Sequence, residues 1–287
     1  MGGFRRRATT ERKGGDMIAV LDYHKVNMLG IDVAAVRMQD VLNICESYIT
    51  NGSNLLIGVV NVAKLVNCHK NIELRESLAE ADVIVADGLP IVWLSKLTGE
   101  PVPERIAGID IMYRLLERAS EKNYGVFFLG ATQQVVQKVV ETVQLKYPGV
   151  RIAGYRNGYF KESQENDVAE QIRNSSADIL FVAVPTPKKE HFLGKWRDYM
   201  NVPVCHGVGG SFDVVAGVTK RAPVWMQKCG MEWFYRLIQE PRKMWKRYLV
   251  TNTVFMKIAL GQIIRAGFNG LFRKHVPNPA SNVRDKK

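Results

Sequence analysis

The sequence predicts an α/β fold: a Rossmann-like, mostly parallel sheet flanked by helices, with a basic helical appendage at the C-terminus. Short runs rich in Val, Ile and Phe recur along residues 18–217, and most are followed by a stretch with helical spacing of apolar residues. Residues 218–287 hold fifteen Lys and Arg against three acids, whereas residues 18–217 hold twenty basic and twenty-three acidic residues. We therefore expect a core over 18–217 and a distinct basic segment over 218–287.

The expected elements alternate along the core. Alternation of buried strands with amphipathic helices is typical of a parallel sheet covered by helices. Ligands of such sheets bind beyond the carboxyl ends of the strands. Asn61, Asp87, Thr132 and the turn at 185–190 follow such ends. The expected strands are 55–61, 83–86, 126–129, 179–184 and 204–208, and the expected helices are 109–122, 133–147, 162–174 and 187–200.

The basic segment is predicted to contain three further helices. The first covers 232–240, and Pro241 either interrupts it or occupies the first turn of the next helix, 242–249. The third, 254–272, mixes large apolar residues with Lys and Arg. It either packs on the core with its charges in solvent or lies on an anionic membrane surface. We favour the membrane, because the basic residues of this helix come with large apolar ones rather than with balancing acids. Earlier in the basic segment lie three of the chain's five tryptophans, Trp225, Trp233 and Trp245.

Composition limits the other classes. No run approaches the roughly eighteen apolar residues that span a bilayer. Residues 1–17 are basic but lack an apolar stretch, so we expect a disordered leader rather than a secretory signal. The four cysteines and five histidines show no ligand or disulfide spacing, which favours a reducing cytoplasm and no bound metal. We expect no cofactor, since dinucleotide and P-loop motifs are absent, and no nucleic-acid partner, since no such module accompanies the basic tail.

Two motifs place charged groups near strand ends. Asp87 and Gly88 follow the strand at 83–86 and form either a tight turn or a turn that presents a general base to a cleft. Arg105 is a candidate clamp for an anion. Asp110 is expected to cap the helix that begins near residue 111.

Two further motifs suit anionic or sugar ligands. Lys188 and Lys189 open a helix after the turn at 185–187, where cations are unfavourable unless a ligand phosphate binds; the alternative is a solvated basic turn. The paired Gly209 and Gly210 permit close approach of the backbone to a ligand.

Read together, these motifs resemble the WecG/TagA/CpsF family of bacterial glycosyltransferases from about residue 26 to about residue 260. The resemblance rests on A-D-G at 86–88, R-I-A-G-I-D at 105–110, V-G-G-S-F-D-V-V-A-G at 208–217, and the long run from Lys220 to Pro241. It implies an inverting, metal-independent transferase, peripheral to the cytoplasmic face of the bacterial inner membrane. Such enzymes move a sugar from a UDP-sugar donor to a polyprenyl-diphosphate-linked sugar in surface polysaccharide synthesis.

The resemblance also assigns residues. It implies that Asp87 is the base and that the basic appendage closes over the site. An alternative is a catalytically weakened relative that binds a UDP-sugar or lipid-linked glycan as an assembly subunit. The sequence leaves oligomer formation open. The expected substrate-binding residues are Asn61, Arg105, Lys189, Glu190, Gly209, Gly210, Arg221 and Arg236.

Two departures concern the donor. The family's T-x-N reads Val59-Val60-Asn61 here, and its P-x-Q-E turn has Lys189 in place of the glutamine. The lost hydroxyl and the gained charge put the usual N-acetylmannosamine-type donor in question. Our hypothesis from Lys189 is a UDP-sugar with a carboxylate, such as a uronic acid.

Overall fold

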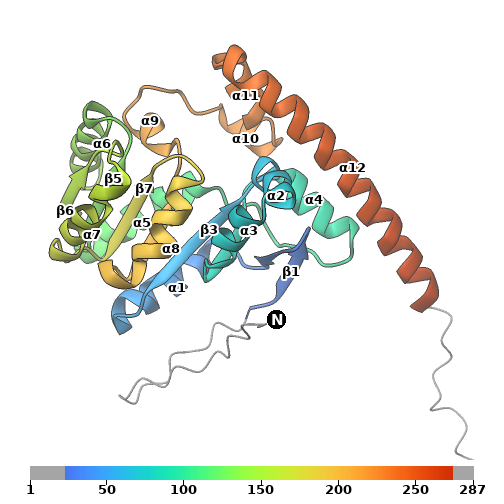
Figure 1. The fold of residues 1–287 in the computed structure, drawn as a ribbon, viewed down its shortest axis with the longest axis horizontal. Coiled ribbons are helices and arrows are strands. Elements are labelled where there is room, and N and C mark those ends of the chain that lie inside the picture. The colour runs from blue at the N-terminus through green and yellow to red at the C-terminus, as the bar shows by residue number, and fades with distance from the viewer. Residues whose placement is uncertain (1–22, 274–287) are drawn as a thin grey trace, which may run out of the picture.

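The computed structural model describes residues 23–273, so the expected leader at 1–17 and the last part of the appendage, 274–287, lie outside the described residues. The centre of the fold is a six-stranded parallel sheet in the order β4-β3-β8-β7-β5-β6 (Figure 1). This arrangement confirms the predicted Rossmann-like α/β class. The strands are β3 Leu55–Val60, β4 Val83–Ala86, β5 Gly125–Gly130, β6 Arg151–Arg156, β7 Ile179–Ala183 and β8 Val204–Gly207.

The interior strands are apolar and buried, as parallel strands covered on both faces must be. Every residue of β7 is buried, and the register pairs Val60 with Ala86, so β3 and β4 end at the same level. The backbone N–H of Asp87 donates to the carbonyl oxygen of Val60 at 2.7 Å. Asp87 therefore lies at the carboxyl edge of the sheet, beside the end of β3.

Helices cover both faces of the sheet. Because successive side chains of a strand point to opposite faces, Phe128 packs with Phe181 and Phe212 under α1, α5, α6 and α9, whereas Phe127 packs with Phe192 under α7 and α8. The helices are α1 Met38–Asn51, α2 Val62–Lys70, α3 Ile72–Ala79, α4 Leu89–Leu97, α5 Gly108–Lys122, α6 Gln133–Lys146, α7 Glu165–Asn174, α8 Lys188–Met200, α9 Ser211–Val215, α10 Val224–Lys228, α11 Glu232–Gln239 and α12 Pro241–Arg273.

A third apolar cluster joins the N-terminal hairpin to the appendage. The hairpin consists of the antiparallel strands β1 Lys25–Met28 and β2 Ile31–Ala34. Its buried side chains pack with those of α2, α3 and α4, and with Phe255 and Ala259 of α12. One side of the appendage thus belongs to the same packed body as the core.

Several elements differ from the sequence prediction. The hairpin, the helices α1 to α4 and the edge strand β6 were not among the expected elements, and a short 3₁₀ turn, Glu162–Gln164, precedes α7. The two helices expected at 242–249 and 254–272 are one continuous helix, α12, which Pro241 opens. Proline is tolerated there because the first turn of a helix needs no N–H donor.

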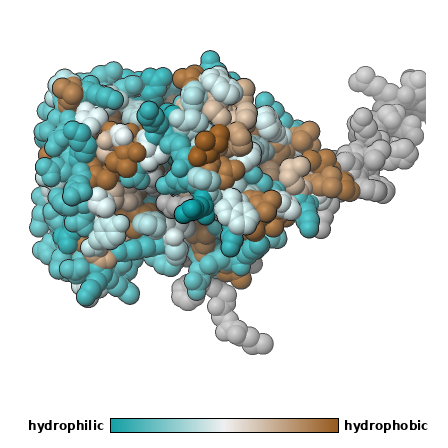
Figure 2. All heavy atoms as spheres, turned by 90° about the horizontal axis from the view of Figure 1, so that it is seen from above, coloured by the Kyte–Doolittle hydropathy of each residue, from teal (hydrophilic) through white to brown (hydrophobic). Residues whose placement is uncertain are grey.

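The helix α12 carries apolar residues on two sides. Phe255 and Ala259 are buried against the core, while Met256, Leu260 and Ile264 are each more than half exposed. The core-packed interpretation is therefore correct for one side of the helix. Seen from above, hydrophobic side chains lie among hydrophilic ones over the half of the molecule that holds α12 (Figure 2). Within residues 23–273, none of the helices combines the length and apolar character needed to cross a bilayer.

All four cysteines lie in the described part of the chain and are free thiols. Cys45, Cys68 and Cys205 are buried, whereas Cys229, at the end of α10, is exposed.

Candidate active site

Asp87 leaves β4 in a turn that the following glycine makes possible. Gly88 has φ of +124°, a backbone conformation that residues with a Cβ rarely adopt, and it caps α4. The Asp87 side chain is half-buried and, among residues 23–273, accepts no hydrogen bond and forms no ion pair. The predicted turn is confirmed, and it holds the carboxyl group at the sheet edge with its oxygens unengaged. The role of this carboxyl group as a base stays a prediction.

The surroundings of Asp87 change its acidity. Burial raises the pKa of this carboxyl group from 3.8 to about 6; the charges of Arg105 and Arg236 act in the opposite direction, and that of Glu232 adds to the rise. A pKa near the working pH suits a general base, which must be ionised yet able to accept a proton. The influence of Glu232 and Arg236 also means that the appendage lies next to Asp87.

Arg105 reaches this place through the loop before α5. The backbone N–H of Ile106 donates to the carbonyl oxygen of Ala86 at 2.8 Å, so the loop runs beside the end of β4. The Arg105 guanidinium lies 2.5 Å from the Glu232 carboxylate and 3.6 Å from that of Asp110. Arg105 is thus near Asp87, as expected, but it is already bound to two acids.

Arg221 completes a network of four charged side chains. Its guanidinium lies 2.6 Å from Asp110 and 3.5 Å from Glu232, so both acids contact both arginines. Arg236 stands four residues after Glu232 on α11, which puts the two side chains on the same side of that helix. The structure therefore brings Arg105 and Arg236 near Asp87, and it joins Arg221 to Arg105 through their shared acids.

The prediction that Asp110 caps a helix is wrong. α5 begins at Gly108, and its N-cap residue is Ala107. Asp110 lies within the first turn, where a carboxylate is favoured by the helix dipole, and its side chain instead holds Arg105 and Arg221.

Asn61 directly follows β3 and begins α2. Its side-chain oxygen accepts the backbone N–H of Lys64 at 2.9 Å, which is the N-cap interaction of that helix. Asn61 and Asp87 end neighbouring strands, so they share the carboxyl edge as the sequence predicted.

Lys189 is buried, so it is not the solvated charge that one of the two alternatives for this turn expected. Binding of a ligand phosphate at this turn stays a prediction. Its ammonium lies 3.3 Å from Glu190, which also pairs with Lys64 at 3.0 Å. Burial and the nearby Lys64 lower the pKa of Lys189. Lys188 donates to the carbonyl oxygen of Phe160, so neither lysine side chain is a simple solvated charge. Glu190, expected to bind substrate, is the buried counter-ion of this group.

Gly209 and Gly210 connect β8 to the short helix α9. Gly209 has φ of +54°, and a Cβ at this position would meet no atom within 4 Å. At Gly210 the nearest atom, Asp213 Oδ2, would lie 3.9 Å away. The space beside both residues is open, and the close approach of a ligand to this backbone stays a prediction.

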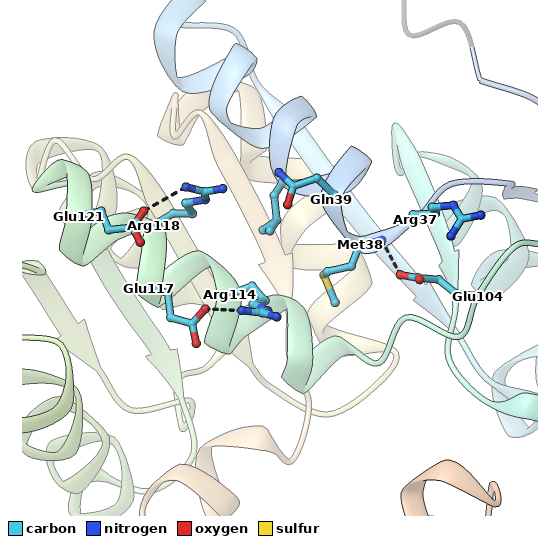
Figure 3. Close-up of a pocket in the computed structure, with 9 residues that line it drawn as sticks. Arg37, Met38, Gln39, Glu104, Arg114, Glu117, Arg118 and Glu121 are labelled. Atoms are coloured by element: carbon cyan, nitrogen blue, oxygen red, sulfur yellow. Dashed lines mark hydrogen bonds and ion pairs between the residues drawn. The ribbon is translucent and has the colours of Figure 1, made fainter.

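A cavity of the described residues lies elsewhere, between α1 and the second half of α5 (Figure 3). It has a volume of about 410 Å³, and a second cavity of about 30 Å³ lies beside Lys189. Asp87 lines neither of them. In the first cavity Arg114 and Arg118 pair with acids of their own helix, at 2.9 and 3.0 Å. Within the described range, no three His, Cys, Asp or Glu side chains gather as a metal site would require.

Sequence reasoning missed Glu232 and the ion pairs of Asp110 with Arg105 and Arg221. One signal pointed to Glu232: it is one of only three acids in the seventy residues of the basic segment. An acid kept in such surroundings is a candidate partner for specific arginines, although the sequence alone does not say which.

Comparisons with known proteins agree with the geometry. The family model for the glycosyl transferase WecG/TagA/CpsF family matches residues 26–268. The N-acetylglucosaminyldiphosphoundecaprenol N-acetyl-beta-D-mannosaminyltransferase of Bacillus spizizenii is 38% identical over 203 residues, which cover 71% of this chain and 78% of that protein. The protein of the same name from Staphylococcus aureus (strain MW2) is 33% identical over 242 residues, or 82% of this chain and 92% of that protein. The chain belongs to the WecG/TagA/CpsF family of glycosyltransferases.

Proposed function

We propose that this glycosyltransferase moves a sugar from a UDP-sugar to a polyprenyl-diphosphate-linked sugar, with inversion at the anomeric carbon and without a metal ion. The observation that carries the proposal is the position of Asp87. Its carboxyl group is half-buried and unpaired at the sheet edge, it has a pKa of about 6, and arginines from both the core and the appendage surround it.

Asp87 is assigned the role of general base. In a single displacement, the acceptor hydroxyl loses its proton to the Asp87 carboxylate while its oxygen bonds to the anomeric carbon. The bond between that carbon and the donor phosphate breaks, and the electron pair leaves with UDP. At neutral pH a carboxyl group with a pKa of about 6 is mostly ionised, so it is ready to accept the proton.

The arginines are assigned to the leaving diphosphate. Negative charge grows on UDP as the bond breaks, and preorganised cations beside it lower the barrier. Arg105 and Arg236 supply positive charge near Asp87, and Arg221 joins them through Asp110 and Glu232, which offset two of the three positive charges.

The relatives guide the choice of substrates. The names of the Bacillus and Staphylococcus proteins specify an N-acetylglucosaminyl-diphosphoundecaprenol acceptor and transfer of N-acetylmannosamine. We assign this chain an acceptor of the same class. For the donor, the buried pair of Lys189 with Glu190 weakens the argument for a uronic acid, because the lysine already has a counter-ion. UDP-N-acetylmannosamine and UDP-uronic acids should be compared directly.

The appendage is assigned to the membrane surface. Exposed aromatic and aliphatic residues, among them Trp225, Trp233 and Trp245, lie on α10, α11 and α12, in a segment with a surplus of twelve basic residues. Such a mixture suits the interface of an anionic bilayer, and we place the enzyme at the cytoplasmic face. The lipid-linked acceptor would then meet the site where α11 lies.

The test measures the rate of sugar transfer by the Asp87→Asn variant. Loss of a general base typically lowers the rate by about 100- to 10,000-fold. Binding of the donor should change little, because the amide keeps the shape of the carboxyl group. Unchanged turnover would remove Asp87 from the mechanism.

Truncation after Gly217 tests the appendage, which supplies Arg221 and Arg236. Full activity of the truncated chain toward the lipid-linked acceptor would refute its role. The assembly-subunit alternative predicts a different result: the complete chain would bind a UDP-sugar yet transfer nothing across a panel of acceptors.

A further inference from the structure

Glu232 places a carboxylate between two arginines beside the proposed base. It lies in the first turn of α11, with Oε2 2.5 Å from Arg105 Nη1 and Oε1 3.5 Å from Arg221 Nε. Asp110 contacts the same arginines at 3.6 and 2.6 Å. In these four side chains two positive charges meet two negative charges. The arginines are therefore neutralised before any ligand arrives.

The fit between Arg221 and these acids is incomplete. Its Nε and Nη2 atoms are buried and have no hydrogen-bond acceptor among the described residues, although Nε lies within ion-pair distance of Glu232. A guanidinium binds carboxylate or phosphate best through two parallel hydrogen bonds. The oxygens of a diphosphate are more numerous than those of one carboxylate, and they suit donors that Glu232 leaves unpaired.

Glu232 comes from a different segment of the chain than Arg105. Arg105 comes from the loop before α5, whereas Glu232 stands on the appendage, so their ion pair joins two separate segments. Glu232 is less buried than Arg105, with side-chain exposures of 27% and 15%. The carboxylate can consequently leave the pair toward solvent, while the arginine stays at the sheet edge.

We propose that Glu232 is an internal stand-in for the diphosphate of the donor: it holds Arg105 and Arg221 in the donor-free enzyme and releases them when a nucleoside diphosphate binds. The inference rests on the proposed function, because it takes a UDP-sugar as the donor. It has a consequence for the fold. Because Glu232 lies in the first turn of α11, replacing its carboxylate with the diphosphate couples donor binding to the position of the appendage.

The experiment measures binding of UDP to the complete chain by isothermal titration calorimetry. Glu232→Gln keeps the size of the side chain and removes its charge. The UDP Kd should fall about tenfold, because the diphosphate no longer competes with a carboxylate for the arginines. Uridine, which has no phosphate, should bind the two chains equally.

Glu117→Gln is the matched control. Glu117 is a surface carboxylate on α5 that pairs with Arg114 at 2.9 Å, so its replacement makes the same change in net charge away from Asp87. The UDP Kd of this variant should equal that of the wild type. A tenfold fall in the control as well would reduce the effect to overall charge and overturn the proposal.

Glu232→Asp provides a second variant that keeps the charge but withdraws it by one methylene. It should bind UDP more tightly than the wild type and less tightly than Glu232→Gln, and it decides the question if circular dichroism shows that the Gln variant is unfolded. If the wild type binds UDP and the folded Glu232 variants bind it equally or more weakly, the role of Glu232 as a stand-in is overturned, whereas the proposed donor is not. Failure of the wild type to bind UDP would overturn both this inference and the proposed donor.

Discussion

Replacing Asp87 with asparagine should stabilise the folded chain at neutral pH, even though it removes the proposed base. Burial raises the pKa of this carboxyl group from 3.8 to about 6. The folded state therefore binds the proton more tightly than the unfolded state does. The contribution of Asp87 to the free energy of unfolding is highest below about pH 4, decreases as the pH rises from there to about 6, and stays lower above that value. Asparagine does not titrate and avoids this loss.

The size of the effect follows from the two pKa values. A difference of about 2 units corresponds to at most about 3 kcal/mol at pH 8, when the unfolded reference is 3.8 and the folded value about 6. At pH 4.5 the same linkage gives about 1 kcal/mol. The stability gained by Asp87→Asn over the wild type should thus be up to about 2 kcal/mol larger at pH 8 than at pH 4.5.

Urea unfolding at the two pH values measures this difference. Asp198→Asn is the control: its side chain on α8 is 88% exposed, so its effect should differ by less than about 0.5 kcal/mol between the two conditions. A gain for Asp87→Asn that is the same at both pH values, or that is larger at pH 4.5, would refute the account of Asp87 as a carboxyl group whose charge is disfavoured by burial.

Three other predictions use the same geometry. Below about pH 6, kcat/KM should fall tenfold for each pH unit as Asp87 gains its proton, and a flat profile between pH 5 and pH 7 would contradict its role as base. Gly88→Ala should lower the free energy of unfolding by about 1–3 kcal/mol, because φ is +124° there, whereas Gly261→Ala inside α12 should be neutral or stabilising in the same urea assay. Met256→Ser with Leu260→Ser should weaken co-sedimentation with anionic vesicles at least tenfold and leave the melting temperature unchanged, since both side chains are exposed on α12. Leu145→Ser, an equally apolar and exposed change on α6, is the control for the vesicle assay, and an equal loss there would show that α12 has no special part in binding.

The sequence indicated the fold best where strands are buried on both faces. β7, with five buried apolar residues, stands out from its flanking polar segments. β6 does not, because this edge strand is only half-buried and reads Arg-Ile-Ala-Gly-Tyr-Arg. The hairpin strands β1 and β2 are four residues each, too short for a periodic pattern to distinguish them from loops.

The candidate site was predictable in its location but not in its pairings. Asp87 and Asn61 were found because they follow apolar strands, and chain order fixes that relation. The ion pairs of Lys189 were not predictable, because its counter-ion Glu190 is shared with Lys64, which is distant in the sequence. The ion pairs that Asp110 and Glu232 form with Arg221 also depend on how the appendage folds back onto the core. No local sequence pattern specifies that arrangement.

The accessibility of a single thiol gives this enzyme a native attachment point for a spectroscopic label. Thiolates are the reactive form of cysteine, and burial raises the pKa of Cys45, of Cys68 and of Cys205, the last to about 12. Maleimide reagents should therefore modify exposed Cys229 first. The adjacent Gly230 packs on Leu89, two residues beyond Asp87. A fluorophore at Cys229 would report, without any engineered cysteine, whether the segment beside the proposed base moves during turnover.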